Sequence, residues 1–176
     1  MISHRIPSAG ASDIHIDIIE ENDTLTFRIE DNGKGMTEDF LANVLDPFTT
    51  TRTTRKVGLG LPLLKMAAEA TGGGLTISSK HEAEHADHGT VVTAVFHTDH
   101  IDCLPLGDMT STVVTLLQSA PFEPRYVYRH IKNGISFELD TDELHSELGP
   151  DIPLSEPAVL DFIASYVSEG EESLEQ

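Results

Sequence analysis

The 176 residues carry 30 Asp and Glu against 11 Lys and Arg, a formal net charge of −19, and 39% of them are hydrophobic. That apolar content supports a folded core, and the acidic balance argues against nucleic acid or an anionic membrane surface as a partner. No apolar run approaches the length of a membrane span, no signal-peptide pattern opens the chain, and the single cysteine excludes an internal disulfide. We therefore expect a cytoplasmic protein in which Cys103 is a buried or partly buried free thiol.

Two strands open the predicted fold. Residues 14–18 and 25–29 alternate apolar and polar side chains, as half-buried strands do. Asn22-Asp23 lies between them and favours a tight turn, so the two strands are predicted to form a hairpin. Thr37 is then expected to cap a short helix that runs to Val44.

Two glycine-rich stretches carry the main functional signal of the sequence. The first, Asp31–Met36, has the form D-x-G-x-G-M and follows the second strand, so Asp31 lies at a strand end and can accept a hydrogen bond from an exocyclic amine. The second, Gly58–Pro62, has the form G-L-G-L-P and opens a helix in which Pro62 is the first residue. The glycines at positions 72–74 end this helix. The start of a helix presents unpaired N–H groups, which suits phosphate. We interpret the two stretches as parts of a nucleotide pocket; the alternative is that they are ordinary strand–turn–helix glycines.

A threonine-rich, basic loop, Thr49–Lys56, lies between the two glycine stretches. Because the chain is acidic overall, an anionic nucleotide must be held by local positive charge, and Arg52, Arg55 and Lys56 are the evident source. The alternative is that this run is simply a solvated loop.

Two further strands, residues 75–78 and 90–96, follow the second helix and complete a mixed, mostly antiparallel sheet with helices on one face, a two-layer α+β sandwich. Between them, residues 81–85 match H-E-x-x-H, with His88 three residues further on. A zinc site needs this motif on a helix, whereas the space here is a short connection between strands. We expect a polar hairpin loop; a zinc hydrolase is the alternative, which metal analysis would test.

The order of these motifs resembles the GHKL superfamily of ATPases and kinases, which includes gyrase B subunits, MutL, heat-shock chaperones and sensor histidine kinases. The resemblance covers residues 9–97 and implies a Bergerat-type fold that binds ATP. Asp46-Pro47-Phe48 looks like the F box of the histidine-kinase branch, and residues 49–57 would be the ATP lid. By resemblance, Asp31 reads the adenine amine and Thr90 matches a threonine near adenine. The residues that the resemblance places around ATP are Asp31, Gly33, Lys34, Gly35, Phe48, Thr49, Thr50, Arg52, Arg55, Lys56, Gly58, Leu59, Gly60, Leu61 and Thr90.

The resemblance also implies Mg²⁺, and here the sequence departs from the family pattern. In the superfamily a helix before the first strand carries an asparagine that holds magnesium. In many members an acidic residue four positions earlier activates water or the acceptor hydroxyl. Counting back from the Ala-Gly-Ala turn at residues 9–11, these two positions fall at Arg5 and Met1, and Pro7 would disturb such a helix. Either the start of the chain is truncated or misassigned, or the magnesium site has degenerated.

Residues 101–176 are expected to form a small accessory α/β module with an acidic tail, beside an ATP-binding domain over residues 1–100. Residues 100–108 look like a signature of stand-alone bacterial GHKL proteins, some found in clusters with electron-transfer hydrogenase subunits. This likeness implies a partner protein that is redox- or hydrogenase-associated. The module carries no catalytic constellation, so it either extends the core or offers a docking or regulatory surface.

Within this module, Asn133-Gly134 is the strongest short hairpin signal, and it sets Arg129 opposite Glu138. Residues 168–176 are acidic and poor in apolar side chains, and we expect them to be frayed. The other predicted elements are a helix from Asp108 through Ser119, a helix from Asp140 to Leu148 and a helix from Ser155-Glu156-Pro157 to near Val167.

Two functions follow from these patterns. The first is an ATP-binding protein of the histidine-kinase branch that transfers phosphate from ATP to a partner protein in trans. Autophosphorylation by the usual route is not expected, because residues 1–12 leave no room for the helical hairpin that carries the acceptor histidine. The second is a non-catalytic, nucleotide-responsive regulatory or adaptor module.

Overall fold

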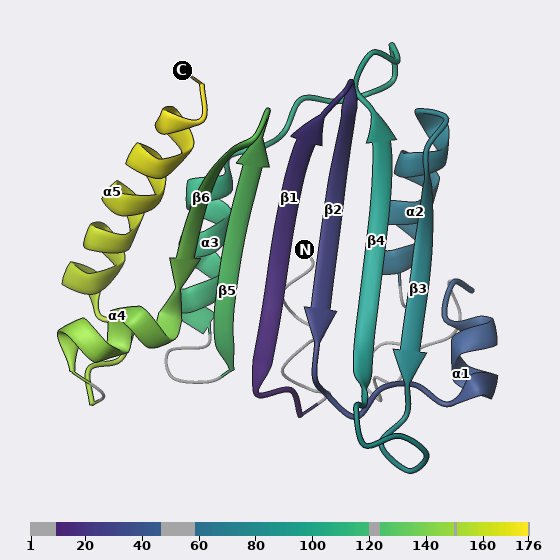
Figure 1. Cartoon of the computed structure of the whole chain (residues 1–176), viewed down its shortest axis with the longest axis horizontal. Helices are drawn as coiled ribbons and strands as arrows, with labels where there is room; N and C mark the ends of the chain where they lie inside the picture. Colours follow the sequence, from purple (N-terminus) through teal and green to yellow (C-terminus); the bar gives the residue numbers. More distant parts are fainter. Residues whose placement is uncertain (1–9, 47–58, 120–123, 150, 176) are drawn as a thin grey trace.

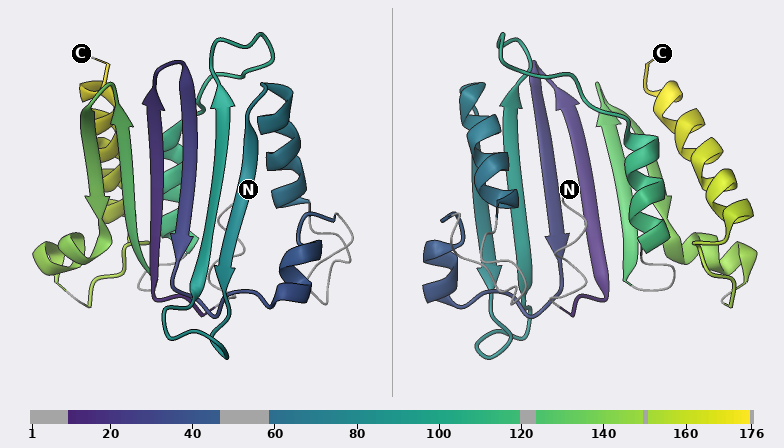
Figure 2. Two further views of the ribbon diagram at one scale, coloured as in Figure 1. Left: turned by 45° about the vertical axis from the view of Figure 1, so that its right-hand side comes forward. Right: turned by 180° about the vertical axis from the view of Figure 1, so that it is seen from behind.

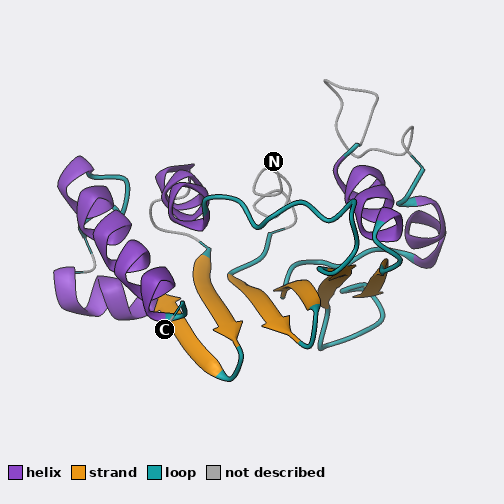
Figure 3. Cartoon of the chain, turned by 90° about the horizontal axis from the view of Figure 1, so that it is seen from above, coloured by secondary structure: helices purple, strands orange, loops and turns teal. Residues whose placement is uncertain are grey.

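The computed structural model describes residues 10–46, 59–119, 124–149 and 151–175. In these residues a six-stranded sheet forms one layer and five helices form the other (Figure 1). The strands are β1 (Asp13–Glu21), β2 (Thr24–Asp31), β3 (Gly74–Lys80), β4 (Gly89–His97), β5 (Arg125–Lys132) and β6 (Ile135–Asp140). The helices are α1 (Glu38–Asn43), α2 (Gly60–Ala70), α3 (Met109–Ser119), α4 (Thr141–Leu148) and α5 (Pro157–Ser173). Figure 3 shows the helices on one side of the sheet, which confirms the two-layer α+β prediction.

The sheet is mixed and mostly antiparallel, as predicted. Its strand order is β3-β4-β2-β1-β5-β6, and every neighbouring pair is antiparallel except β1 and β5. The β1–β2 hairpin turns at Asn22 and Asp23, whose φ angles are 49° and 58°. Asn and Asp are the non-glycine residues that tolerate this left-handed conformation best, and two such residues in a row favour the twist of a two-residue hairpin.

Residues 101–176 continue the same sheet and supply much of its core. After β4 the chain crosses over through α3, so that β5 lies parallel beside β1. Ile14 and Ile18 of β1 are fully buried, and they belong to one cluster with Leu117 of α3 and Ile163 of α5. Figure 2 shows α3 and α5 lying next to each other behind this half of the sheet. The apolar faces of β1 and β2 are therefore covered by helices that come from the second half of the chain.

The β5–β6 hairpin confirms the prediction made from Asn133-Gly134. These two residues have φ angles of 49° and 83°, and the register places Arg129 opposite Glu138. On the helix side of the hairpin Tyr128 and Leu139 are each 2% exposed. The Asn-Gly turn thus fixes the register that turns both apolar side chains toward α5.

The C-terminal helix corrects the sequence prediction. α5 begins at Pro157 as expected, but it continues to Ser173 instead of ending near Val167, and residues 168–173 are not frayed. Gly170 is buried against the ring of Phe137, and the carboxylate of Glu171 accepts a hydrogen bond of 2.7 Å from the Tyr128 hydroxyl. The acidic composition of this segment predicts fraying, whereas Glu171 has the buried partners Tyr128 and His130 on β5.

The remaining helix starts agree with the sequence to within two residues. Thr37 caps α1 and Asp140 caps α4, each through its side-chain oxygen. Asp108 accepts a hydrogen bond from the N–H of Ser111 in the first turn of α3. α2 begins at Gly60, so Pro62 is an early residue of this helix and not its first. Among the described helices, none combines the length and the apolar composition that crossing a bilayer requires.

Candidate functional site

The structure describes eight of the residues that the sequence places around ATP. They lie at the end of β2, on β4 and at the start of α2; they are Asp31, Gly33, Lys34, Gly35, Thr90, Leu59, Gly60 and Leu61. The others lie in residues 47–58, outside the described residues; they are Phe48, Thr49, Thr50, Arg52, Arg55, Lys56 and Gly58. Met1 and Arg5, the positions compared with the magnesium-binding helix, also lie outside.

Asp31 is the last residue of β2 and is half-buried, as its position at a strand end predicts. One carboxylate oxygen, Oδ1, accepts a hydrogen bond of 2.8 Å from the N–H of Gly33. Burial raises the pKa of Asp31, an effect that the Gly33 hydrogen bond opposes and the neighbouring charge of Glu30 reinforces. Asp31 therefore presents a partly desolvated carboxylate with one oxygen already aligned by its own loop.

Thr90 lies directly opposite Asp31 in the β2–β4 register, so the structure brings these two predicted residues together. Thr90 is 7% exposed, and its hydroxyl lies 2.9 Å from the hydroxyl of Ser79 on β3. The Ser79 hydroxyl in turn accepts a hydrogen bond of 2.8 Å from the N–H of Met36. Hydrogen bonds thus connect the loop after β2 to Ser79 on β3 and, through it, to Thr90 on β4. No sequence motif had singled out Ser79.

The loop after β2 is pressed closely against the β3–β4 hairpin. Gly35 has a φ of 69°, and a Cβ at this position would lie 1.9 Å from the carbonyl oxygen of Lys80. Likewise a Cβ on Gly89 would lie 2.1 Å from the carbonyl oxygen of Asp31. No side chain fits at either place. Gly35 is therefore required by contacts within the protein itself, before any ligand is considered.

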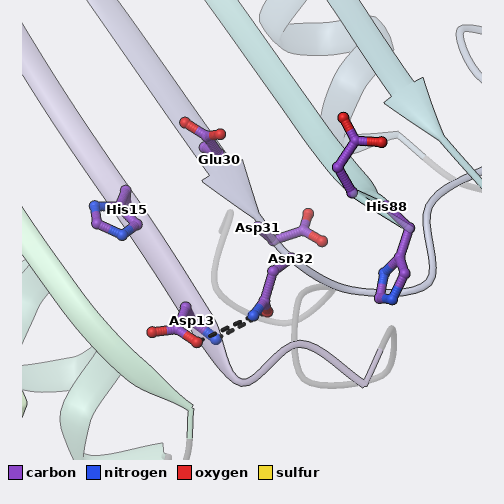
Figure 4. Close-up of a pocket in the computed structure, with 7 residues that line it drawn as sticks. Asp13, His15, Glu30, Asp31, Asn32 and His88 are labelled. Carbon is purple, nitrogen blue, oxygen red and sulfur yellow. Dashed lines mark hydrogen bonds between the residues drawn. The ribbon is translucent and has the colours of Figure 1, made fainter. Parts of the chain in front are cut away.

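Asn32 ties the same loop to the start of β1 and was not predicted to do so. Its Oδ1 accepts hydrogen bonds from the N–H groups of Ser12 and Asp13 at 2.9 and 3.0 Å. Its Nδ2 donates to the Ser12 hydroxyl and to the Asp13 carboxylate, as Figure 4 shows in part. The amide of Asn43 is also engaged, because its Nδ2 donates to the carbonyl of Asp39. Both amides close to the loop are thus used within the protein.

A hollow of about 360 Å³ lies at this end of the sheet (Figure 4). The residues that line it are Asp13, His15, Glu30, Asp31, Asn32, Asp87 and His88. Four of the seven are carboxylic acids, which repel a polyphosphate. Asp31 is one of the lining residues, but the hollow as a whole is suited to cationic or neutral groups. A nucleotide's phosphates would therefore have to bind outside this hollow.

The start of α2 offers such a place. Leu59 makes no side-chain cap, and the first turn holds no acidic residue, so among the described residues no side chain competes for the free N–H groups. Among the described residues outside the first turn of α2, no atom lies within 4 Å of a Cβ built on Gly60. α2 therefore begins with exposed backbone donors, a positive dipole end and open space in front of Gly60.

The histidine-rich segment between β3 and β4 is a hairpin loop, as the sequence favoured, and not a helix. His81 Nδ1 accepts a hydrogen bond from the N–H of Ala83 within the loop. In the described part of the chain, no three His, Cys, Asp or Glu side chains are grouped so that they could hold a metal ion. The segment therefore lacks the helix that the H-E-x-x-H motif needs to bring both imidazoles to a zinc ion.

Comparison with known proteins assigns residues 1–100 to one family. They match the family model of the histidine kinase-, DNA gyrase B- and HSP90-like ATPases. The sensor kinase CckA of Brucella abortus is 36% identical over 72 residues, which are 40% of this chain and 8% of that protein. The sensor protein KdpD of Clostridium acetobutylicum is 37% identical over 78 residues, or 42% of this chain and 9% of that protein.

A third relative is the C4-dicarboxylate transport sensor protein DctB of Pseudomonas aeruginosa, 41% identical over 69 residues, which are 39% of this chain and 10% of that protein. The match thus covers a tenth or less of each of these relatives. Among solved structures, the mycobacterial sensor histidine kinase MprB is similar with a TM-score of 0.38 and 22% identity, covering 47% of this chain and 57% of that one. The family assignment rests on the sequence matches.

Proposed function

We propose that this chain, which belongs to the histidine kinase-, DNA gyrase B- and HSP90-like ATPase family, binds ATP between the loop after β2 and the start of α2. The observation that carries the proposal is the pairing of Asp31 with Thr90 across β2 and β4, because these are the two residues that the family resemblance puts at the adenine. The two sides of the pocket then have separate tasks, base recognition at the strand ends and phosphate binding at the helix.

Asp31 recognises the base. Its Oδ1 is occupied by the N–H of Gly33, so the other oxygen remains to accept a hydrogen bond from the exocyclic amine of adenine. Partial burial strengthens such a hydrogen bond, because less water competes for the carboxylate. A base that presents a carbonyl at the same position would meet a second acceptor and be rejected.

The phosphates lie at the start of α2. Support comes from the uncapped N-terminus of this helix and from the open space at Gly60. Because the chain is strongly acidic, positive side chains are needed to offset its electrostatic field at the phosphates. Lys34, which is exposed in the loop after β2, is one such side chain. Arg52, Arg55 and Lys56 are proposed to supply the rest of that charge.

The chemistry proposed is transfer of the terminal phosphoryl group to a partner protein in trans. Support comes from the relatives at 36% to 41% identity, which are a sensor kinase and two sensor proteins. The contribution of this chain would be to hold the nucleotide and neutralise the charge on its phosphates, since phosphoryl transfer relies mostly on positioning and electrostatics.

A second candidate function is a non-catalytic, nucleotide-responsive module. It is favoured by Asn32, because the Oδ1 atom with which an asparagine coordinates magnesium accepts two backbone hydrogen bonds within the protein. Magnesium supplies charge neutralisation in nucleotide phosphoryl transfer, so a chain without a site for it would bind and sense but not turn over.

Incubation of the protein with γ-labelled ATP, with and without Mg²⁺, separates the two candidates. Release of labelled phosphate, or its transfer to an added partner protein, supports the kinase or ATPase function. Stable ATP binding with no turnover over hours supports the sensing module. A chain that binds no ATP under either condition would overturn both.

A further inference from the structure

The histidine-rich loop between β3 and β4, residues 81–88, does more than connect two strands. It lies against the loop after β2, at the lower end of the sheet in Figure 1. The N–H of Glu82 donates a hydrogen bond of 2.8 Å to the carbonyl of Lys34, and the ring of His88 lies 2.7 Å from the carbonyl of Gly33. The two loops are thus joined at consecutive residues of the first glycine stretch.

The contact of His88 fixes the tautomer of its ring. A carbonyl oxygen can only accept a hydrogen bond, so the Nδ1 atom that faces Gly33 carries the proton. Gly33 is then held through both of its backbone polar groups. Its carbonyl accepts from His88, and its N–H donates to Oδ1 of Asp31.

We propose that His88 is a positioning residue for base recognition, holding Gly33 so that its N–H aligns the carboxylate of Asp31 toward the adenine amine. This inference rests on the proposed ATP site. It also gives a role to the histidine-rich segment, because the last histidine of that segment donates to a backbone carbonyl of the glycine loop.

His88 is suited to this task in a way that its neighbours are not. The Glu82 contact is made by backbone, so it does not depend on which side chain is present. Asp87 is exposed, and its carboxylate pairs with Lys80. Among the side chains of residues 81–88, His88 is the one whose described hydrogen bond reaches Gly33. In Figure 4 its ring lies beside the loop that carries Asp31 and Asn32.

Three substitutions of His88 test the proposal by affinity for ATP in calorimetric titration. Asn carries its amide nitrogen Nδ2 on Cγ, as His carries Nδ1, so His88→Asn can still donate to Gly33. Gln places its amide one bond further out, and Ala has no donor. We expect His88→Ala and His88→Gln to bind ATP about five- to tenfold more weakly than wild type, and His88→Asn to stay within about twofold.

His85→Ala is the matched control, because His85 lies in the same loop and is exposed. It should bind ATP as wild type does. Unchanged affinity in His88→Ala, or failure of His88→Asn to restore affinity while folded, would overturn the role of His88.

A measurement without nucleotide separates this inference from the proposed function. Nitrogen-15 NMR of the free protein should show His88 protonated at Nδ1, and the amide signal of Gly33 should move in His88→Ala but not in His88→Asn. An Nε2–H tautomer would overturn the positioning role even if ATP binds. Conversely, a wild-type protein that shows the Nδ1–H tautomer but binds no ATP would overturn the ATP site and, with it, the role of His88 in base recognition.

Discussion

His130 on β5 and Glu171 near the end of α5 are joined by a hydrogen bond of 2.8 Å between the imidazole Nδ1 and the carboxylate. The other ring nitrogen lies 3.0 Å from the carboxylate of Glu20 on β1, and Lys132 lies 3.6 Å from that same carboxylate. The histidine is 3% exposed. The last turns of α5 are therefore attached to two strands of the sheet through a charged cluster around the buried His130.

This cluster predicts a pH dependence of stability. Burial disfavours the charged ring of His130, but its hydrogen bonds with Glu171 and Glu20 outweigh that effect and raise its pKa above 6.5. Burial likewise raises the pKa of Glu171, but the hydrogen bonds from His130 and Tyr128 outweigh it and lower the pKa below 4.5. Because the pKa of His130 is raised, its charged ring stabilises the fold below pH 6.5. That stabilisation is lost as the pH rises through the pKa of the folded state. Because the pKa of Glu171 is lowered, its carboxylate stabilises the fold above pH 4.5. That stabilisation is lost as the pH falls through the pKa of the folded state.

We therefore expect the contribution of this pair to the free energy of unfolding to be greatest between pH 4.5 and 6.5, and to decline above that range. The His130→Gln variant has no titrating ring at this position. Its free energy of unfolding should be about 2 kcal/mol lower than that of wild type near pH 6, and it should fall less steeply as the pH rises above 6.5. Denaturant unfolding of both proteins at several pH values checks the prediction. An identical pH profile in the variant would contradict it.

Gly170 predicts a second stability effect in the same helix. A Cβ at this position would lie 2.2 Å from the ring of Phe137, which packs at 5.3 Å between ring centroids against Tyr166. Because the ring has little room to move, Gly170→Ala should lower the free energy of unfolding by about 1–3 kcal/mol, even though alanine favours helix.

Gly107→Ala is the control for this substitution, since a Cβ on Gly107 meets no atom of the other described residues within 4 Å and its φ is not in the left-handed region. It should be near neutral in thermal unfolding. If Gly170→Ala were as stable as Gly107→Ala, the end of α5 would not pack on β6 as described.

Local sequence signals predicted most of the elements but not how α5 ends. The turns at Asn22-Asp23 and Asn133-Gly134 specify their hairpins through backbone conformation alone, so each could be read from a few residues. The helical character of residues 168–173 depends on partners that lie far away in the chain, such as Tyr128 and His130. A segment that is acidic in composition gives no sign that such partners exist.

The same distinction holds at the candidate site. Asp31 and Thr90 could be singled out because each lies in a recognisable motif, and the strand register places them opposite each other. His88 and Ser79 could not, because their roles arise from contacts with Gly33 and Met36 across 55 and 43 positions of the sequence. The requirement for glycine at position 35 is likewise explained only by the nearby carbonyl of Lys80.

Gly60 provides a test of phosphate binding that does not disturb the fold. Gly60→Val places a branched side chain where ATP phosphates are proposed to lie, and its Cβ has no atom of another described segment within 4 Å. We expect ATP affinity to fall at least tenfold, with a melting temperature close to that of wild type in the absence of nucleotide. Thermal unfolding with and without ATP measures both.

Gly73→Ala is the contrasting variant, expected to change stability and not phosphate binding, because a Cβ on Gly73 would lie 1.9 Å from the carbonyl oxygen of Val95. This variant should lose stability whether or not ATP is present. A folded Gly60→Val protein that binds ATP normally would show that the phosphates do not lie at the start of α2.

The most direct test of the proposed function is calorimetric titration of ATP into wild type and into Asp31→Asn. The amide oxygen of asparagine can still accept from the N–H of Gly33, whereas its NH₂ group would face the adenine amine with a donor in place of an acceptor. We expect wild type to bind ATP, and Asp31→Asn to bind about a hundredfold more weakly while keeping its fold. Equal affinity in the two proteins, or no binding by wild type, would contradict the assignment of Asp31 to the base.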